Sequence, residues 1–213
     1  MGKKINVMIV DDHAILRAGL KQVLSETDDI DVVAEGGSAN DAINLCRTQD
    51  ADVMLLDITL PDRSGIEALQ YIKKDNPRLA VLMLSMHRED QYALRALKAG
   101  ASGYLCKQSA SDELVDAVRM VAKGKKYISA GVGEILANQV LTESDKPLHD
   151  MLSNREYETL LLIASGLSAT EIAEKLSLSV KTISMYRTRL LEKMQLKHNA
   201  ELTHYAIKNN LVD

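Results

Sequence analysis

The sequence predicts an α/β fold: a doubly wound, five-stranded parallel sheet, followed by a small all-α domain of four helices. Over residues 1–125, five short, continuous apolar runs alternate with amphipathic helical segments, a pattern typical of parallel strands buried on both faces. After about residue 151 the strand signals stop and helical patterns alone continue. A chain of 213 residues is also long enough for two small domains.

Each strand of the sheet is predicted from an apolar run that ends in a turn. The predicted strands are Ile5–Val10, Val32–Ala34, Val53–Leu56, Ala80–Leu84 and Tyr104–Cys106. The predicted helices between and after them are Ala14–Ser25, Ala39–Thr48, Gly65–Lys74, Glu89–Ala99 and Asp112–Lys123. Ser64 and Glu67 have the spacing of a capping box, and Gly100 marks the end of the fourth helix. Five successive βα units imply right-handed crossovers with helices on both faces of the sheet.

The helices of the second domain are predicted mainly from their caps. Ser153 and Glu156 have capping-box spacing, as do Ser168 and Glu171, and Ser179 can cap a third helix. The last three predicted helices are about Ala169–Leu176, Val180–Met194 and Asn199–Asn209. We therefore expect a first domain over residues 1–125, a linker over 126–147 with a short helix at Glu134–Leu141, and a second domain over 148–213.

Composition excludes several classes of protein. The chain carries 26 basic and 30 acidic residues, a net charge of −4, so its overall charge does not favour nucleic acid. Its apolar runs are too short to span a bilayer, and Asp11 and Asp12 interrupt the first run too early for a secretory signal. Cys46 and Cys106 form no motif that indicates a disulfide framework or a zinc site. We expect a cytoplasmic protein with no membrane partner.

Three carboxylates follow two strands that are neighbours in this topology. Asp11 and Asp12 come after the first strand, and Asp57 comes after the third. Ligands of doubly wound sheets bind beyond the carboxyl ends of the strands, so these side chains are expected to converge. Converging carboxylates repel one another unless a cation lies between them, and oxygen ligands suit magnesium. The pattern predicts an Mg²⁺ site.

Two further side chains are expected at the same edge. Ser85 lies at the end of the fourth strand, and Lys107 follows the fifth. A hydroxyl, an ammonium and Mg²⁺ around one carboxylate would offset charge on a phosphoryl group, which is the main requirement for phosphoryl transfer to that carboxylate.

Residues 1–125 resemble a response-regulator receiver domain, which has the flavodoxin-like fold. The matching segments are VDDH at 10–13, LLDITLPDRSG at 55–65, LS at 84–85 and GYLCK at 103–107. The resemblance implies Asp57 as phosphoacceptor, Asp11 and Asp12 as its partners in holding Mg²⁺, Ser85 and Lys107 as phosphoryl contacts, and Tyr104 as the switch aromatic. Many receivers have proline after the lysine, whereas Gln108 follows here, so the isomer of the Lys107–Gln108 bond stays open.

The helix Val180–Met194 has two contrasting faces when its residues are laid out at about 100° per residue. The face expected in the core holds Ile183, Tyr186, Leu190 and Met194. The opposite face holds Lys181, Ser184, Met185 and Thr188. With the helix before it and a short turn, this arrangement predicts a helix-turn-helix at about Ile172 to Leu191, in which the outward face reads the major groove.

The segment LSNREYETLLLIASGLSATEIAEKLSLSVKTISMYRTRLLEKM resembles the LuxR-type helix-turn-helix domain. Together with the first domain, the whole chain resembles a NarL/FixJ-family transcriptional response regulator. The resemblance implies base contacts from Ser184, Met185 and Thr188, and phosphate contacts from Lys181, Thr182, Arg187 and Arg189. It implies as partners a cognate sensor histidine kinase, promoter DNA, a second copy of the chain on DNA, and RNA polymerase.

Three functions compete at this point. The first is a transcription regulator in which Mg²⁺-dependent phosphorylation of Asp57 switches dimerisation and sequence-specific DNA binding, with the phosphoryl group later lost by self-dephosphorylation. The second is an enzyme, a phosphohydrolase with an aspartyl-phosphate intermediate, but such enzymes need a second Asp two residues after the nucleophile, where this chain has Thr59. The third is an adaptor whose helical domain binds a protein. We expect the regulator and not an enzyme.

Overall fold

The computed structural model describes residues 4–86, 89–107, 110–141 and 147–212. The chain divides into two compact units, Met1–Asn138 and Gln139–Asp213. Within the described ranges, no helix combines the length and hydropathy that crossing a bilayer requires.

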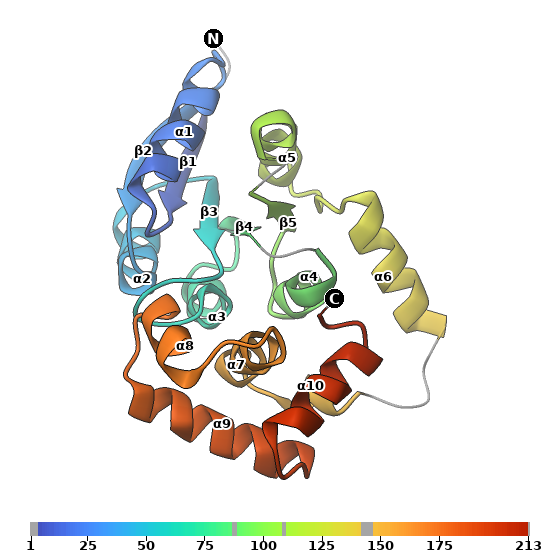
Figure 1. The fold of residues 1–213 in the computed structure, drawn as a ribbon. Helices are drawn as coiled ribbons and strands as arrows, with labels where there is room; N and C mark the ends of the chain where they lie inside the picture. Colours follow the sequence, from blue (N-terminus) through green and yellow to red (C-terminus); the bar gives the residue numbers. More distant parts are fainter. Residues whose placement is uncertain (1–3, 87–88, 108–109, 142–146, 213) are drawn as a thin grey trace. The chain divides into compact units, whose positions relative to one another are not determined.

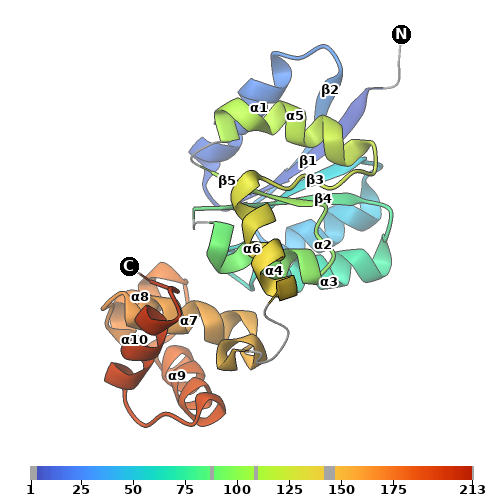
Figure 2. The ribbon, with the colours of Figure 1, turned by 90° about the vertical axis from the view of Figure 1, so that its right-hand side faces the viewer.

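The first unit is a five-stranded parallel sheet in the order β2-β1-β3-β4-β5, as the sequence predicts. The strands are β1 (Ile5–Val10), β2 (Ile30–Gly36), β3 (Val53–Asp57), β4 (Ala80–Ser85) and β5 (Gly103–Cys106). The helices are α1 (Ala14–Ser25), α2 (Ala39–Thr48), α3 (Gly65–Asp75), α4 (Glu89–Lys98) and α5 (Ala110–Ala122). Figure 2 shows α1 and α5 on one face of the sheet and α2, α3 and α4 on the other. Every residue of β3 and β4 is buried because helices cover both faces.

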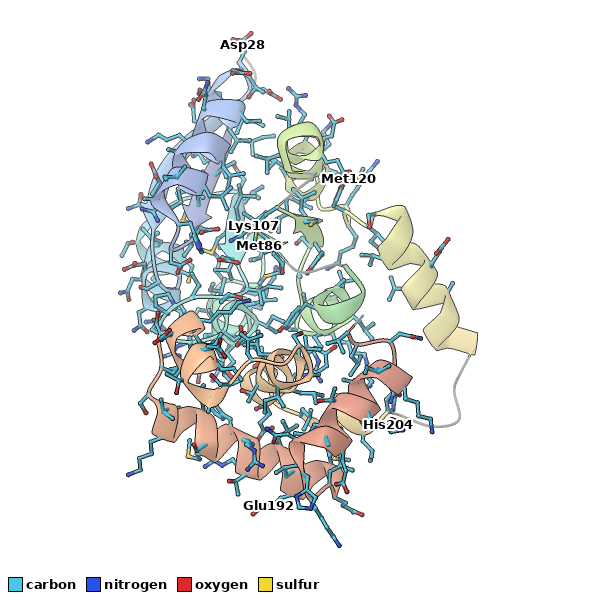
Figure 3. All side chains as sticks on the ribbon, viewed as in Figure 1. Asp28, Met86, Lys107, Met120, Glu192 and His204 are labelled. Carbon is cyan, nitrogen blue, oxygen red and sulfur yellow. The ribbon has the colours of Figure 1, made fainter. Side chains whose placement is uncertain are left out.

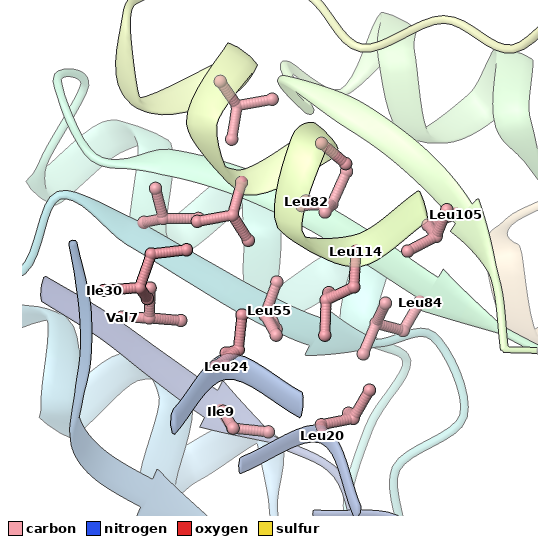
Figure 4. Close-up of a cluster of buried hydrophobic side chains, with 14 of the residues drawn as sticks. Val7, Ile9, Leu20, Leu24, Ile30, Leu55, Leu82, Leu84, Leu105 and Leu114 are labelled. Carbon is pink, nitrogen blue, oxygen red and sulfur yellow. The ribbon is translucent and has the colours of Figure 1, made fainter. Parts of the chain in front are cut away.

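The core on the α1 and α5 face is built from alternate residues of the strands, since successive side chains of a strand point to opposite faces. Figure 4 shows this cluster, in which Val7 and Ile9 of β1 lie with Leu55 of β3, and Leu24 and Leu114 cover them from α1 and α5. Each fully buried Leu or Ile contributes about 1.5–3 kcal/mol relative to exposure. This packing holds the strand ends in a common register.

The elements extend beyond several of the predicted limits. β2 runs from Ile30 to Gly36, well past the predicted Val32–Ala34. This edge strand alternates buried or half-buried residues with the exposed Asp31, Val33 and Glu35. Helix α5 begins at Ala110 and not at Asp112. The linker helix, α6, covers Ala130–Leu141 and so begins four residues before the predicted Glu134. The missed ends include buried apolar residues, Ile30 and Val132, because Asp31 interrupts the apolar run of β2 and two glycines flank Val132 in α6.

Residues 147–212 form a short 3₁₀ helix and four α-helices, and the four α-helices agree with the prediction. They are η1 (Leu148–Met151), α7 (Asn154–Ala164), α8 (Ala169–Lys175), α9 (Val180–Met194) and α10 (Asn199–Lys208). Both predicted capping boxes of this unit are confirmed, at Ser153 with Glu156 and at Ser168 with Glu171. In the first unit, by contrast, Ser64 caps α3 through the N–H of Ile66, one position earlier than a capping box requires.

Candidate functional sites

Four polar side chains meet at the carboxyl edge of the sheet. Asp11 follows β1, Asp57 ends β3, Ser85 ends β4 and Lys107 follows β5. All four residues are buried. Lys107 and Met86, which follow two neighbouring strands, are labelled at this edge in Figure 3. The parallel sheet therefore brings residues from four separate segments to one edge.

Lys107 bridges two carboxylates. Its Nζ lies 2.6 Å from Oδ2 of Asp11 and 2.7 Å from Oδ2 of Asp57, and its side chain is only 3 % exposed. Burying an ammonium is costly unless it is paired, and here two carboxylates pair it. One ammonium consequently lies between two buried carboxyl groups.

The electrostatics of Asp57 reflect this burial. Desolvation raises the pKa of Asp57 to about 6; Lys107 opposes this rise, while the charge of Asp11 adds to it. The Thr59 backbone N–H donates to Oδ1 of Asp57 at 3.2 Å and also favours the ionised form. A further cation beside Asp57 would lower its pKa and favour the carboxylate.

The carboxylates form a cluster that fits a hard divalent cation. Ligand atoms of Asp11, Asp12, His13 and Asp57 all lie within 4.8 Å of one another. The cluster holds three carboxylates, and oxygen donors are those that Mg²⁺ prefers. The Asp12 side chain is 36 % exposed, so the cluster opens to solvent on one side, where water ligands could enter.

His13 is the member of this cluster that sequence reasoning did not assign to the site. Its Nδ1 lies 2.7 Å from Oδ1 of Asp12, and its backbone N–H donates to Oδ1 of Asp11 at 2.8 Å. The signal was present, because His13 directly follows the two carboxylates. The pair of contacts orients both carboxylates from the start of α1.

The loop after Asp57 is held in place by hydrogen bonds to α2. Asp62 accepts hydrogen bonds from the N–H groups of Ala39 and Asn40 at 2.8 and 2.9 Å, which ties this loop to the first turn of α2. Burial alone would raise the pKa of Asp62, but these and other backbone hydrogen bonds hold it below its usual value. The loop is thus anchored to a second helix besides α3.

Two further residues named in the sequence analysis are Tyr104 and Gln108. Tyr104 is 1 % exposed and lies opposite Met83 in the register of β4 and β5. Gln108, on which the open question of the Lys107–Gln108 bond depends, lies outside the described residues.

The second unit presents the predicted outward face on α9. Lys181, Ser184, Met185, Thr188 and Arg189 are exposed, while Thr182 and Arg187 are half-buried. Met185, with 42 % of its surface exposed, is an apolar side chain on an otherwise polar helix face. On the other side of α9, Ile183, Leu190 and Met194 are buried as predicted, whereas Tyr186 is half-buried. The predicted outward face of α9 is therefore exposed to solvent within this unit.

Several of these polar side chains are held by local hydrogen bonds. The Thr182 hydroxyl lies 2.8 Å from Oγ of Ser179, the N-cap of α9. The Thr188 hydroxyl donates to the Ser184 carbonyl at 3.0 Å, so it keeps only its acceptor capacity for other partners. Thr188 can thus accept a hydrogen bond from a base, and it can donate one only by giving up the bond within the helix.

Two family models match the two units. "Response regulator receiver domain" matches residues 7–119, and "Bacterial regulatory proteins, luxR family" matches residues 150–206. The chain belongs to the NarL/FixJ family of response regulators. This response regulator is therefore a transcription regulator with a LuxR-type DNA-binding domain and not an enzyme.

Relatives of this response regulator align along nearly its whole length. Response regulator UvrY of Escherichia coli K12 is 38 % identical over 208 residues, covering 97 % of this chain and 95 % of UvrY. Response regulator protein VraR of Staphylococcus aureus is 36 % identical over 208 residues, covering 98 % of this chain and 99 % of VraR. The two-domain order is thus shared with whole relatives.

Solved structures agree with this assignment. RcsB of Salmonella enterica serovar Typhimurium, bound to a promoter in the presence of the phosphomimetic BeF₃⁻, superposes with a TM-score of 0.64 at 30 % identity, covering 95 % of this chain and 98 % of RcsB. A LuxR-family two-component response regulator from Aurantimonas sp. superposes with a TM-score of 0.61 at 34 % identity, covering 65 % of this chain and 99 % of the other.

Proposed function

We propose that a cognate sensor histidine kinase phosphorylates this response regulator on Asp57, and that phosphorylation switches its dimerisation and its sequence-specific binding to promoter DNA. The observation that carries the proposal is the buried ammonium of Lys107 between Asp11 and Asp57. We assign the receiver domain to residues 1–125, a linker to 126–147 and the helix-turn-helix domain to 148–213. A protein that receives phosphate from a histidine kinase and binds promoter DNA would act in the cytoplasm.

The chemistry asks each side chain for a distinct contribution. A carboxylate oxygen of Asp57 forms a bond to phosphorus as the N–P bond of the kinase phosphohistidine breaks. The Lys107 ammonium and the Ser85 hydroxyl contact the phosphoryl oxygens and stabilise their charge. Asp11, Asp12 and Asp57 would hold Mg²⁺, which offsets further phosphoryl charge when bound. Water later hydrolyses the acyl phosphate, so the protein dephosphorylates itself.

Tyr104 is the proposed switch aromatic. It lies in β5 next to Gly103 and two strands away from Asp57, and its side chain is buried. When Ser85 turns towards a phosphoryl oxygen, Tyr104 can move into the space that Ser85 leaves. Such repacking would change the surface of the receiver around β5, and so its tendency to form a dimer.

The DNA-binding part of the proposal rests on α9. Ser184, Met185 and Thr188 are proposed to contact bases, and Lys181, Thr182, Arg187 and Arg189 to contact phosphates. DNA binding by this domain is supported by a relative: RcsB was solved on a promoter with a phosphomimetic, and two RcsB dimers were solved on two parallel DNAs. Two-fold symmetric dimers suit half-sites one helical turn apart, and RNA polymerase is the further partner proposed at a promoter.

Phosphotransfer from purified histidine kinases and from acetyl phosphate tests the first half of the function. Radiolabel should enter the wild-type chain with Mg²⁺ and not with EDTA, and Asp57→Asn should take up none. Asp116→Asn is the matched control, because the Asp116 side chain is 84 % exposed on the surface of α5. Wild-type labelling of Asp57→Asn would show that another residue is the phosphoacceptor.

A selection of genomic DNA fragments on the phosphorylated protein, followed by gel shifts at rising salt, tests the second half. Phosphorylation should tighten binding to the selected sites, and binding should weaken steeply with salt because phosphate contacts release counterions. No preference for any genomic fragment in either state would contradict regulation through promoter DNA.

A further inference from the structure

Arg187 is joined to the helix that follows the recognition helix. Its Nε donates to Oδ1 of Asn199 at 2.6 Å, and Asn199 is the first residue of α10. At about 100° per residue, Arg187 and Arg189 flank the outward face of α9 on opposite sides. The two arginines are thus positioned to contact the two DNA backbones that border a groove. The hydrogen bond to Asn199 joins Arg187 to α10.

The chemistry of this bond suits a prepared phosphate contact. A guanidinium carries five N–H donors in a rigid plane, and the bond to Asn199 uses the Nε–H. It therefore fixes the plane of the fork while the Nη groups keep their donors for a phosphate oxygen. Asn199 is neutral, so it orients Arg187 without cancelling the charge that attracts phosphate. A side chain that is already oriented loses less conformational freedom on binding.

We propose that Asn199 is a positioning residue for DNA binding, which holds Arg187 in the orientation in which it contacts a backbone phosphate. The inference rests on the proposed function, because it requires that α9 faces DNA. It also makes the orientation of Arg187 depend on the start of α10. A displacement of α10 relative to α9 would then weaken a phosphate contact made by α9.

The test uses the full chain and a fluorescein-labelled mixed-sequence duplex, so that only phosphate contacts are measured. Binding is followed by anisotropy over a range of salt concentrations. Arg187→Ala should lower the slope of log K against log salt by about 1, the expected loss for one phosphate contact. Asn199→Ala should weaken binding several-fold at fixed salt and leave the slope nearly unchanged, because the charge of Arg187 remains. Asn199→Asp should lower the slope by about 1, because its carboxylate neutralises Arg187.

A double-mutant cycle separates positioning from a structural effect of Asn199. Asn199→Ala should have no further effect in the Arg187→Ala background, and its full effect in the Arg189→Ala background, which is the matched control on the other flank. Equal effects of Asn199→Ala in both backgrounds would overturn the proposal, since Asn199 would then act through the stability of α10. If Asn199→Ala lowers the melting temperature, Asn199→Ser, which suits a helix start, replaces it in the cycle.

The same data distinguish failure of this inference from failure of the proposed function. If Arg187→Ala leaves affinity and slope unchanged while Lys181→Ala and Arg189→Ala lower both, α9 binds DNA and the role of Asn199 is wrong. If all three substitutions leave binding unchanged, α9 is not the DNA-binding helix and the proposed interface is wrong as well.

Discussion

A Cβ atom on Gly65 would lie 1.8 Å from the backbone carbonyl oxygen of Asp57. The chain folds back here, because the N–H of Gly65 donates to the Ile58 carbonyl at 2.7 Å. Glycine is required for this close approach of backbone to backbone. The first turn of α3 thus packs directly against the backbone of Asp57, the proposed phosphoacceptor.

Gly65→Ala should therefore destabilise the receiver and disturb Asp57. We expect a loss of about 1–3 kcal/mol in the free energy of unfolding, as for other overpacked sites, together with slower labelling by acetyl phosphate. Chemical denaturation and labelling rates measure the two effects. Gly19→Ala in α1 is the control. Apart from the chain neighbours of Gly19 and the nearby backbone of α1 itself, no atom of the described residues lies within 4 Å of a Cβ at Gly19, so this change should stabilise the helix by about 0.5–1 kcal/mol. A stability of Gly65→Ala equal to the wild type would contradict the steric account.

Asp57→Asn should make the protein more stable at alkaline pH. The pKa of Asp57 is raised to about 6 in the folded chain from an ordinary value near 4. The folded state therefore binds more protons than the unfolded state between about pH 4 and 6, and stability falls as pH rises through this window. Without Mg²⁺, Asp57→Asn should exceed the wild type by about 1–3 kcal/mol at pH 8 and match it near pH 4. Thermal melts of both proteins, with Asp116→Asn as control, measure the difference; equal melting temperatures at pH 8 would count against the burial of an ionised Asp57.

Mg²⁺ should stabilise the wild-type receiver by binding the folded state alone. A ligand at a hundredfold excess over its dissociation constant adds about 2.7 kcal/mol. Asp12→Asn removes one of the three carboxylates, so its melting temperature should respond much less to added MgCl₂, and EDTA should abolish the difference between the two proteins. An equal response of Asp12→Asn and the wild type would show that the cation binds elsewhere.

Ile15→Asp should distinguish recognition of the kinase from the phosphorylation chemistry at Asp57. Ile15 is 90 % exposed in the first turn of α1, two residues after His13 of the acidic cluster. An apolar side chain left in water beside the phosphoacceptor pocket is suited to contact with the kinase. We expect Ile15→Asp to slow phosphotransfer from the kinase about 10-fold or more, since losing a contact worth 1.4 kcal/mol has that effect, and to spare labelling by acetyl phosphate. Tyr71→Asp on α3, across the sheet from α1 (Figure 2), is the control; equal loss with both donors would indicate a folding defect instead.

Local sequence patterns were enough to predict the succession of strands and helices along the chain, the capping boxes at Ser153 and Ser168, and the acidic residues at strand ends. These features depend on neighbours within about four residues, so a local pattern is enough to predict them. The packing of separate elements was needed to see that Lys107 bridges Asp11 and Asp57, that Gly65 lies against the backbone of Asp57, and that Arg187 bonds to Asn199. Those contacts join separate elements, and their distances follow from how the helices pack on the sheet and on one another, which no local period encodes.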